Sequence, residues 1–153
     1  MKKVYLDCNI LIDWLLDREP YSYYASKVIE LTEENKIISF VSGLTLANTY
    51  YIIKKELNKE IANEFLKDSL NLFKFLSITE FTIKKAISKQ YKDFEDDLHY
   101  TASIENDIDY LITRNKKDFP KNKIKIVDAK EFLEINFNLL TKRDKKWKKE
   151  KFI

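Results

Sequence analysis

Short apolar segments alternate with longer amphipathic segments along the chain. The short segments are apolar or β-branched runs, typical of parallel strands covered on both faces, at residues 4–6, 37–41, 75–78, 110–113 and 125–127. Between them, apolar residues recur at the three- and four-residue spacing of amphipathic helices. No tight hairpin signal joins the strands. The pattern therefore predicts an α/β fold with a central parallel sheet and helices on both faces.

Polar residues able to cap helices stand where several of these helices begin. Ser42, Thr79, Asp93 and Asp128 each precede a predicted helix, and their side-chain oxygens can accept the unpaired N–H groups of its first turn. Asn58 is expected to separate two consecutive helices. In the second of these, roughly residues 60–74, we expect the apolar positions to form a buried face made of Ile61, Phe65, Leu66, Leu70 and Phe73.

The composition is typical of one soluble globular domain. With 153 residues, 44% of them hydrophobic, the chain can bury a sizeable core. The longest apolar runs are far shorter than a membrane span, and no signal-peptide pattern opens the chain. The single cysteine, Cys8, excludes an internal disulfide and fits a reducing, cytoplasmic environment. The single glycine leaves no Gly-rich phosphate loop.

Positive charge is concentrated at the C-terminal end. Residues 141–153 hold seven basic and two acidic residues, an excess of +5, whereas the preceding residues carry a net charge of −2. We therefore divide the chain into a folded domain at residues 1–137 and a basic tail at residues 138–153. Such a tail is either a solvated chain end or a nucleic-acid contact with phosphate-binding lysines and a stacking ring. The residues proposed for nucleic-acid contact are Lys145, Lys146, Trp147 and Lys148, together with Arg114 and Lys116 of the folded domain.

Carboxylates follow strands at two places and lie near a helix start at a third. Asp7 ends the first strand, Asp118 follows a late strand, and Asp96 is close to the start of a helix. The carboxyl ends of parallel strands share one sheet edge, where α/β proteins bind ligands. Simpler explanations are also available, because Asp7 can cap the helix after it and the acids between Asp93 and Asp97 suit a helix N-terminus.

The acids near residue 96 also suggest a cation site. Four acids within five positions repel one another, and a divalent cation would relieve that repulsion. Oxygen ligands without a Cys or His cluster favour Mg²⁺ or Mn²⁺ over zinc. Such a cation lowers the pKa of bound water and suits phosphodiester hydrolysis without a protein nucleophile. His99, the only histidine, either reaches this site or is a packed histidine.

Three segments carry a more specific signal: Tyr5–Asp13, Asp93–Leu98 and Leu111–Phe119, the last with a Thr-Arg-Asn sequence and an Asp-Phe pair. A fourth segment, Val41–Asn48, lies between the first two. In this order and spacing they resemble the PIN domain, the fold of VapC-type toxin ribonucleases, over the chain to about Phe132. The resemblance implies a three-layer α/β/α fold and metal-dependent cleavage of RNA.

The resemblance also implies roles for individual residues. Asp7, Asp96 and Asp118 are the expected catalytic, metal-binding acids. The family commonly has a further acid on the helix after the second strand, and here that position is Asn48, whose carbonyl can bind a cation but brings no charge. Cys8 replaces a threonine often found beside the first acid and is expected to be structural. We expect the site to be supported by Asn9, Asp97, Thr113 and Asn115.

Together these expectations describe a cytoplasmic, Mg²⁺- or Mn²⁺-dependent endoribonuclease, the toxin of a toxin–antitoxin pair. Two alternatives stay open: a PIN-fold RNA-binding or scaffold protein that Asn48 has left catalytically weak, and a metal nuclease that acts on DNA. The expected partners are an RNA substrate and a cognate antitoxin, with a homodimer as a further option and no membrane contact. The pairs Tyr23–Tyr24 and Tyr50–Tyr51 are expected to pack in the core or between helices, with an antitoxin or self-association surface as the alternative.

Overall fold

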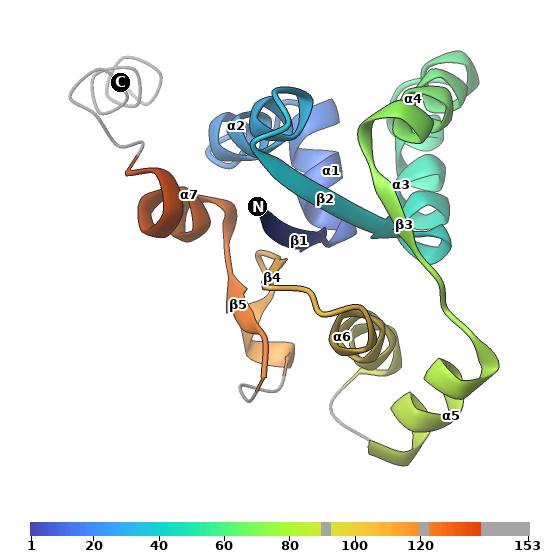
Figure 1. Ribbon diagram of the computed structural model, residues 1–153. Helices are drawn as coiled ribbons and strands as arrows, with labels where there is room; N and C mark the ends of the chain where they lie inside the picture. Colours follow the sequence, from blue (N-terminus) through green and yellow to red (C-terminus); the bar gives the residue numbers. More distant parts are fainter. Residues whose placement is uncertain (90–92, 120–122, 139–153) are drawn as a thin grey trace.

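The computed structural model describes residues 1–89, 93–119 and 123–138, in which strands and helices alternate as the hydrophobic pattern predicts (Figure 1). The first half holds β1 (Lys2–Leu6), α1 (Cys8–Leu15), α2 (Ser22–Glu33), β2 (Ile37–Ser42), α3 (Gly43–Glu56) and α4 (Lys59–Leu72). The second half holds β3 (Lys74–Leu76), α5 (Glu80–Lys89), α6 (Phe94–Glu105), β4 (Tyr110–Ile112), the 3-10 turn η1 (Lys116–Asp118), β5 (Lys125–Val127) and α7 (Ala129–Phe137).

The sheet has β1 at its centre. All five strands are parallel, in the order β3-β2-β1-β4-β5, and Tyr5 of β1 lies opposite Phe40 of β2 and Leu111 of β4. The chain first extends the sheet from β1 to β3 and then crosses β1 to add β4 and β5. Because the direction changes there, the carboxyl ends of β1 and β4 are neighbours at the place where open α/β sheets bind ligands. The predicted parallel α/β/α fold is confirmed.

The alternation of side chains along β1 separates two cores. Val4 and Leu6 are completely buried in a core shared with α1, α2 and α7. Tyr5 points to the opposite face, where it packs with Leu111 and with Tyr100 of α6. Figure 1 shows the same division, with α1, α2 and α7 on one side of the sheet and α6 on the other. Both faces of β1 are therefore covered, as its unbroken apolar run predicts.

The predicted helix caps are present. Side-chain oxygens of Ser42, Asn58, Thr79, Asp93 and Asp128 each accept a backbone N–H group from the first turn of the helix that follows. Each cap satisfies a donor that the helix itself leaves unpaired, and helix starts could therefore be located from sequence.

The buried face predicted for α4 is partly wrong. Phe65 is buried, but Ile61 and Leu70 are 37% and 71% exposed, and the small residues Ala62 and Ser69 are buried instead. α4 packs chiefly against α3, beside the sheet's edge strand β3. Small residues let two helices approach closely, so the contact needs only a narrow stripe and leaves the flanking apolar residues in solvent.

Some expectations concern residues outside the described ranges. The proposed tail contact at Lys145, Lys146, Trp147 and Lys148 lies there, and the division of the chain at residue 137 stays a prediction. The side chain of Asp118 is likewise outside the described part, although its backbone ends η1. Among the described residues, no helix is long and apolar enough to cross a membrane.

The orientation of α4 can be tested with two matched substitutions. Leu111→Ala removes a completely buried side chain from the central sheet and is expected to cost about 2–5 kcal/mol, from lost transfer energy and the cavity left behind. Leu70→Ala removes the same atoms from a side chain that is 71% exposed and is expected to change stability by about 0.5 kcal/mol or less. Denaturant unfolding followed by circular dichroism measures both, and similar losses would contradict this orientation.

Candidate active site at the carboxyl edge of the sheet

Asp7 is a buried carboxylate held only by neutral donors. It follows β1 directly, its side chain caps α1, and the residue is 6% exposed. Oδ1 accepts from the Cys8 N–H at 2.7 Å, and Oδ2 accepts from Thr113 Oγ1 at 2.8 Å and Asn9 Nδ2 at 3.4 Å. Within the described part of the chain no cation forms an ion pair with it. Its orientation is therefore fixed while its charge is left uncompensated.

The segment after β4 supports this carboxylate. Thr113 is completely buried, and its hydroxyl oxygen accepts from the Asn115 N–H at 3.0 Å while donating to Asp7. Asn9 Oδ1 accepts from the Arg114 N–H at 3.3 Å, which links α1 to the same segment. Asn9 and Thr113 thus both contact the Asp7 carboxylate, and their support of a metal site stays a prediction. Asn115 contributes its backbone N–H, while its residue is exposed.

The first turn of α6 brings further acids to the same region. Asp93 caps the helix by accepting from the Asp96 N–H at 3.1 Å, which confirms the capping explanation for this residue. Burial raises the pKa of the Cys8 thiol to about 12, and the negative charges of Asp7, Glu95 and Asp96 add to that rise. The carboxylate after β1 and those in the first turn of α6 are therefore close enough to Cys8 to act on its thiol. The neighbouring Asp97 is buried, at 3% exposure.

Glu95 is a site residue that the sequence did not single out. Its Oε1 accepts from Asn48 Nδ2 at 2.7 Å and lies 3.4 Å from His99 Nε2. The contact with His99 lowers the pKa of Glu95, and the bond from Asn48 acts in the same direction. Asn48, predicted as a cation ligand, thus binds a carboxylate of α6 through its amide nitrogen. The negatively charged oxygen beside residue 48 is therefore supplied by Glu95.

His99 is both packed and connected to the site. It is 1% exposed, and its Nδ1 contacts the hydroxyl of Tyr5, which also contacts Ser42 Oγ and Thr45 Oγ1. Burial raises the pKa of Tyr5, so its hydroxyl keeps its proton and can donate to Nδ1. A neutral His99 protonated at Nε2 satisfies both contacts. This buried chain of bonds fixes Glu95 relative to β1.

The donors gathered here suit a hard divalent cation. The Asp7 carboxylate is flanked by the Thr113 hydroxyl and by the amide nitrogen of Asn9, and carboxylate and hydroxyl oxygens are among the ligands that Mg²⁺ and Mn²⁺ prefer. Among the described residues no three His, Cys, Asp or Glu side chains form a ready-made metal cage. Mg²⁺ commonly binds one or two carboxylates and completes its shell with water and substrate phosphate. The residues present therefore fit a Mg²⁺-type site, to which Asp118 is predicted to contribute.

Arg114, predicted to contact nucleic acid, pairs with a buried acid. Its Nη2 donates to Asp13 Oδ1 at 3.1 Å, and its Nε lies 2.8 Å from Oδ2, an ion pair without hydrogen-bond alignment. Asp13 is 0% exposed, whereas 31% of the Arg114 side chain is exposed. Burial raises the pKa of Asp13, and the guanidinium opposes that rise. Arg114 is therefore a structural partner of α1 as well as an exposed cation.

Lys116, the other predicted cation of the folded domain, lies between two acids. Its Nζ pairs with Glu131 and is 3.5 Å from Asp128 Oδ2, and the bond to Glu131 raises the pKa of Lys116. The side chain keeps 40% of its surface exposed. Nucleic-acid contact stays a prediction for both Arg114 and Lys116.

Comparison with known proteins identifies the family. Residues 3–117 match the PIN domain, so the chain belongs to the PIN domain family, as its motifs predict. It is also similar to ribonuclease VapC1 of Aquifex aeolicus, with 27% identity over 138 residues that cover 87% of this chain and 94% of that protein.

Solved structures share the fold. A chain of VapBC2 from Rickettsia felis, bound to a DNA fragment from its promoter, gives a TM-score of 0.61 at 20% identity over 82% of this chain and 97% of that one. A chain of a toxin–antitoxin complex from Klebsiella pneumoniae gives a TM-score of 0.62 at 20% identity with the same coverage. At such identities the likeness establishes the architecture.

The Asp13–Arg114 pair predicts a pH-dependent loss of stability. Arg114→Gln leaves Asp13 buried without a positive partner and is expected to cost about 3 kcal/mol at neutral pH, at the low end for a buried pair because Arg114 is partly exposed. Without the guanidinium the pKa of Asp13 rises further. A carboxyl whose pKa is raised by folding favours the folded state at low pH, and this contribution is lost as pH rises through the folded-state value.

The loss caused by Arg114→Gln should therefore be larger near neutral pH than in mild acid, where Asp13 is protonated. Urea unfolding of wild type and variant from about pH 4.5 to 7.5 measures the difference. The double variant Asp13→Asn/Arg114→Gln removes the titrating group and is the control. A loss of equal size at every pH would show that Asp13 does not sense Arg114.

Proposed function

We propose that this protein is a Mg²⁺- or Mn²⁺-dependent endoribonuclease and the toxin of a toxin–antitoxin pair. The observation that carries the proposal is the Asp7 carboxylate, buried among neutral donors next to the acids of α6. Membership of the PIN domain family and the likeness to ribonuclease VapC1 support the same activity. The choice of Mg²⁺ or Mn²⁺ is supported only by the chemistry of the oxygen donors.

The cation would be held by oxygens of Asp7 and Asp96, with Asp118 as a further predicted ligand and the Glu95 carboxylate adding negative charge nearby. When bound, it supplies a water of lowered pKa and stabilises negative charge on the scissile phosphate. Thr113 and Asn9 keep the Asp7 carboxylate in one orientation. Asn48 and His99 do the same for Glu95 and keep it ionised.

Covalent catalysis is not supported by the residues at this edge. The pKa of Cys8 is about 12, so the thiol stays protonated at neutral pH and is a poor nucleophile. The only histidine, His99, is committed to Tyr5 and Glu95. Hydrolysis by an activated water is therefore the chemistry that these side chains favour.

The proposed partner is a cognate antitoxin. Several structural relatives are described as toxin–antitoxin or VapBC complexes, including one from Salmonella typhimurium bound to DNA. A homodimer is the other assembly to test. The rival function, an RNA-binding scaffold without cleavage, rests on the uncharged Asn48, and the proximity of Glu95 to that amide weakens it.

Metal binding can be tested without measuring activity. At a hundredfold excess over its Kd, Mn²⁺ should stabilise the wild type by about 2.7 kcal/mol, or about 5–10 °C in melting temperature. Asp7→Asn should abolish the shift, and Glu95→Gln should reduce it. Glu60→Gln is the matched control, because Glu60 holds the same second position in the first turn of α4, far from this edge. Equal shifts in wild type and Asp7→Asn would rule the site out.

Cleavage should depend on the same carboxylate. Wild type with Mg²⁺ or Mn²⁺ is expected to cleave single-stranded RNA, and Asp7→Asn should lower the rate at least about a hundredfold, because an amide binds hard cations less well than a carboxylate. Competition between RNA and DNA of the same sequence separates the ribonuclease from a DNA nuclease. RNA binding without metal-dependent cleavage would favour the scaffold function.

A further inference from the structure

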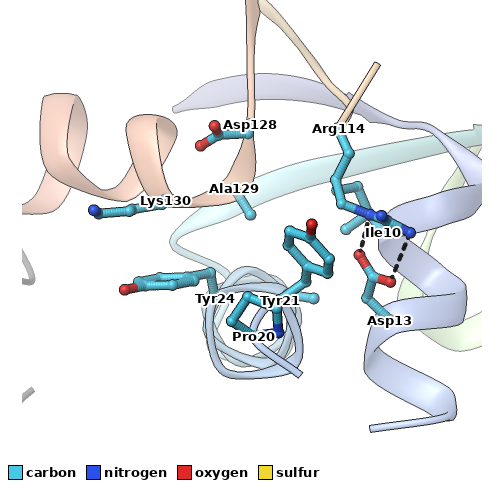
Figure 2. A pocket seen from close by; sticks show the side chains of 10 residues that line it. Ile10, Asp13, Pro20, Tyr21, Tyr24, Arg114, Asp128, Ala129 and Lys130 are labelled. Carbon is cyan, nitrogen blue, oxygen red and sulfur yellow. Dashed lines mark hydrogen bonds and ion pairs between the residues drawn. The ribbon is translucent and has the colours of Figure 1, made fainter. Parts of the chain in front are cut away.

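A cavity of about 620 Å³ lies beside the proposed site, between α1, α2, α7 and the segment after β4 (Figure 2). Arg114 belongs to both places. Its side chain lines the cavity, and its backbone N–H donates to Asn9, whose amide reaches Asp7. An RNA strand with a phosphate at Asp7 can therefore also reach the cavity.

One wall of the cavity is a stacked pair of planar groups. The guanidinium carbon of Arg114 is 4.2 Å from the centre of the Tyr21 ring. The Nε and Nη2 atoms of the same guanidinium face the Asp13 carboxylate. Tyr21 is 43% exposed. Asp13 and Arg114 already fix this arrangement. Binding of a ligand that stacks here therefore costs little side-chain conformational entropy.

The side of Tyr21 away from Arg114 borders the hollow. Figure 2 shows Tyr21 between Arg114 on one side and a space bounded by Tyr24, Ala129 and Asp128 on the other. The walls are largely apolar or aromatic. Polar groups of Asp128 and Lys130 lie at the rim. Flat, mostly apolar walls with a few polar groups at the edge suit a planar heterocycle.

The charges that line the cavity balance. Arg114 is paired with Asp13, Asp128 with Lys116, and Lys130 with Glu134, so each charge that lines the cavity already has a partner. A phosphate would find no spare positive charge inside. An uncharged group that stacks and offers polar edges is the better match.

We propose that this cavity holds one unpaired nucleobase of the RNA strand, stacked on the Tyr21 ring, while a nearby phosphodiester lies at Asp7. The proposal rests on the proposed ribonuclease function and adds a position along the strand that the protein reads. Base stacking on an aromatic ring typically contributes about 5- to 140-fold in affinity.

Binding of a fluorescein-labelled single-stranded RNA of ten nucleotides tests the proposal. Full-length Asp7→Asn, expected not to cleave, serves as the parent and binding is followed by fluorescence anisotropy. Adding Tyr21→Ala should weaken binding at least about fivefold, and Tyr21→Trp should keep it. Tyr51→Ala removes a ring that is 66% exposed on α3 and is the matched control, with no expected change.

A second measurement does not depend on any change at the cavity. RNAs that carry a single abasic nucleotide at successive positions should bind the parent normally except at one position, where affinity falls as much as with Tyr21→Ala. At that position the two changes together should cost no more than either alone, because they remove the same contact.

The outcomes separate this site from the ribonuclease function. A parent that binds no RNA would overturn the proposed function, and the nucleobase site with it. RNA binding unchanged by Tyr21→Ala, or abasic losses spread evenly along the strand, would overturn the nucleobase site alone. Loss of binding to a protein partner without loss of RNA binding in Tyr21→Ala would assign the cavity to that partner and overturn the proposal.

Discussion

The structure depends on one buried negative charge at the end of its central strand. Burying a carboxylate is costly unless hydrogen bonds and an opposite charge meet it, and the described part of the chain gives Asp7 hydrogen bonds but no opposite charge. Thr113, Asn9 and the start of α1 fix its oxygens, so folding prepares a place for positive charge that the described chain does not fill. Burial of both apolar faces of β1 stabilises the fold and offsets the cost of burying this charge.

Buried polar contacts, rather than surface loops, set the geometry around that charge. Tyr5 on β1 holds His99, and His99 with Asn48 holds Glu95, so the acids of α6 are positioned from the core outward. On the other side of the site, Asp13 of α1 pairs with Arg114 in the segment after β4. The Tyr5–His99 contact is buried and the others are partly buried; in the buried part, where the dielectric is low, a partly satisfied group would be costly and a single arrangement is strongly preferred.

The sequence predicted what depends on local pattern and missed what depends on long-range pairing. Strands, helix starts and the edge carrying Asp7 follow from apolar runs and capping residues. Glu95 was overlooked because its partner Asn48 is 47 positions away, and Arg114 looked like a free cation because Asp13 is 101 positions away. The exposed apolar residues of α4 were missed for the same reason. Helical periodicity identifies the apolar positions, but the width of the buried stripe depends on the neighbouring helix.

The parallel topology also determines when the site can exist. Thr113 is synthesised 106 positions after its partner Asp7, and β4 must cross to the far side of β1 before the two can meet. The segments that carry Asp7 and Asn9 are therefore synthesised long before this edge of the sheet can be assembled. A chain interrupted before β4 is translated keeps the local bonds from Cys8 and Asn9 but lacks the Thr113 hydroxyl that holds Oδ2. The edge is therefore complete only after β4 has joined the sheet.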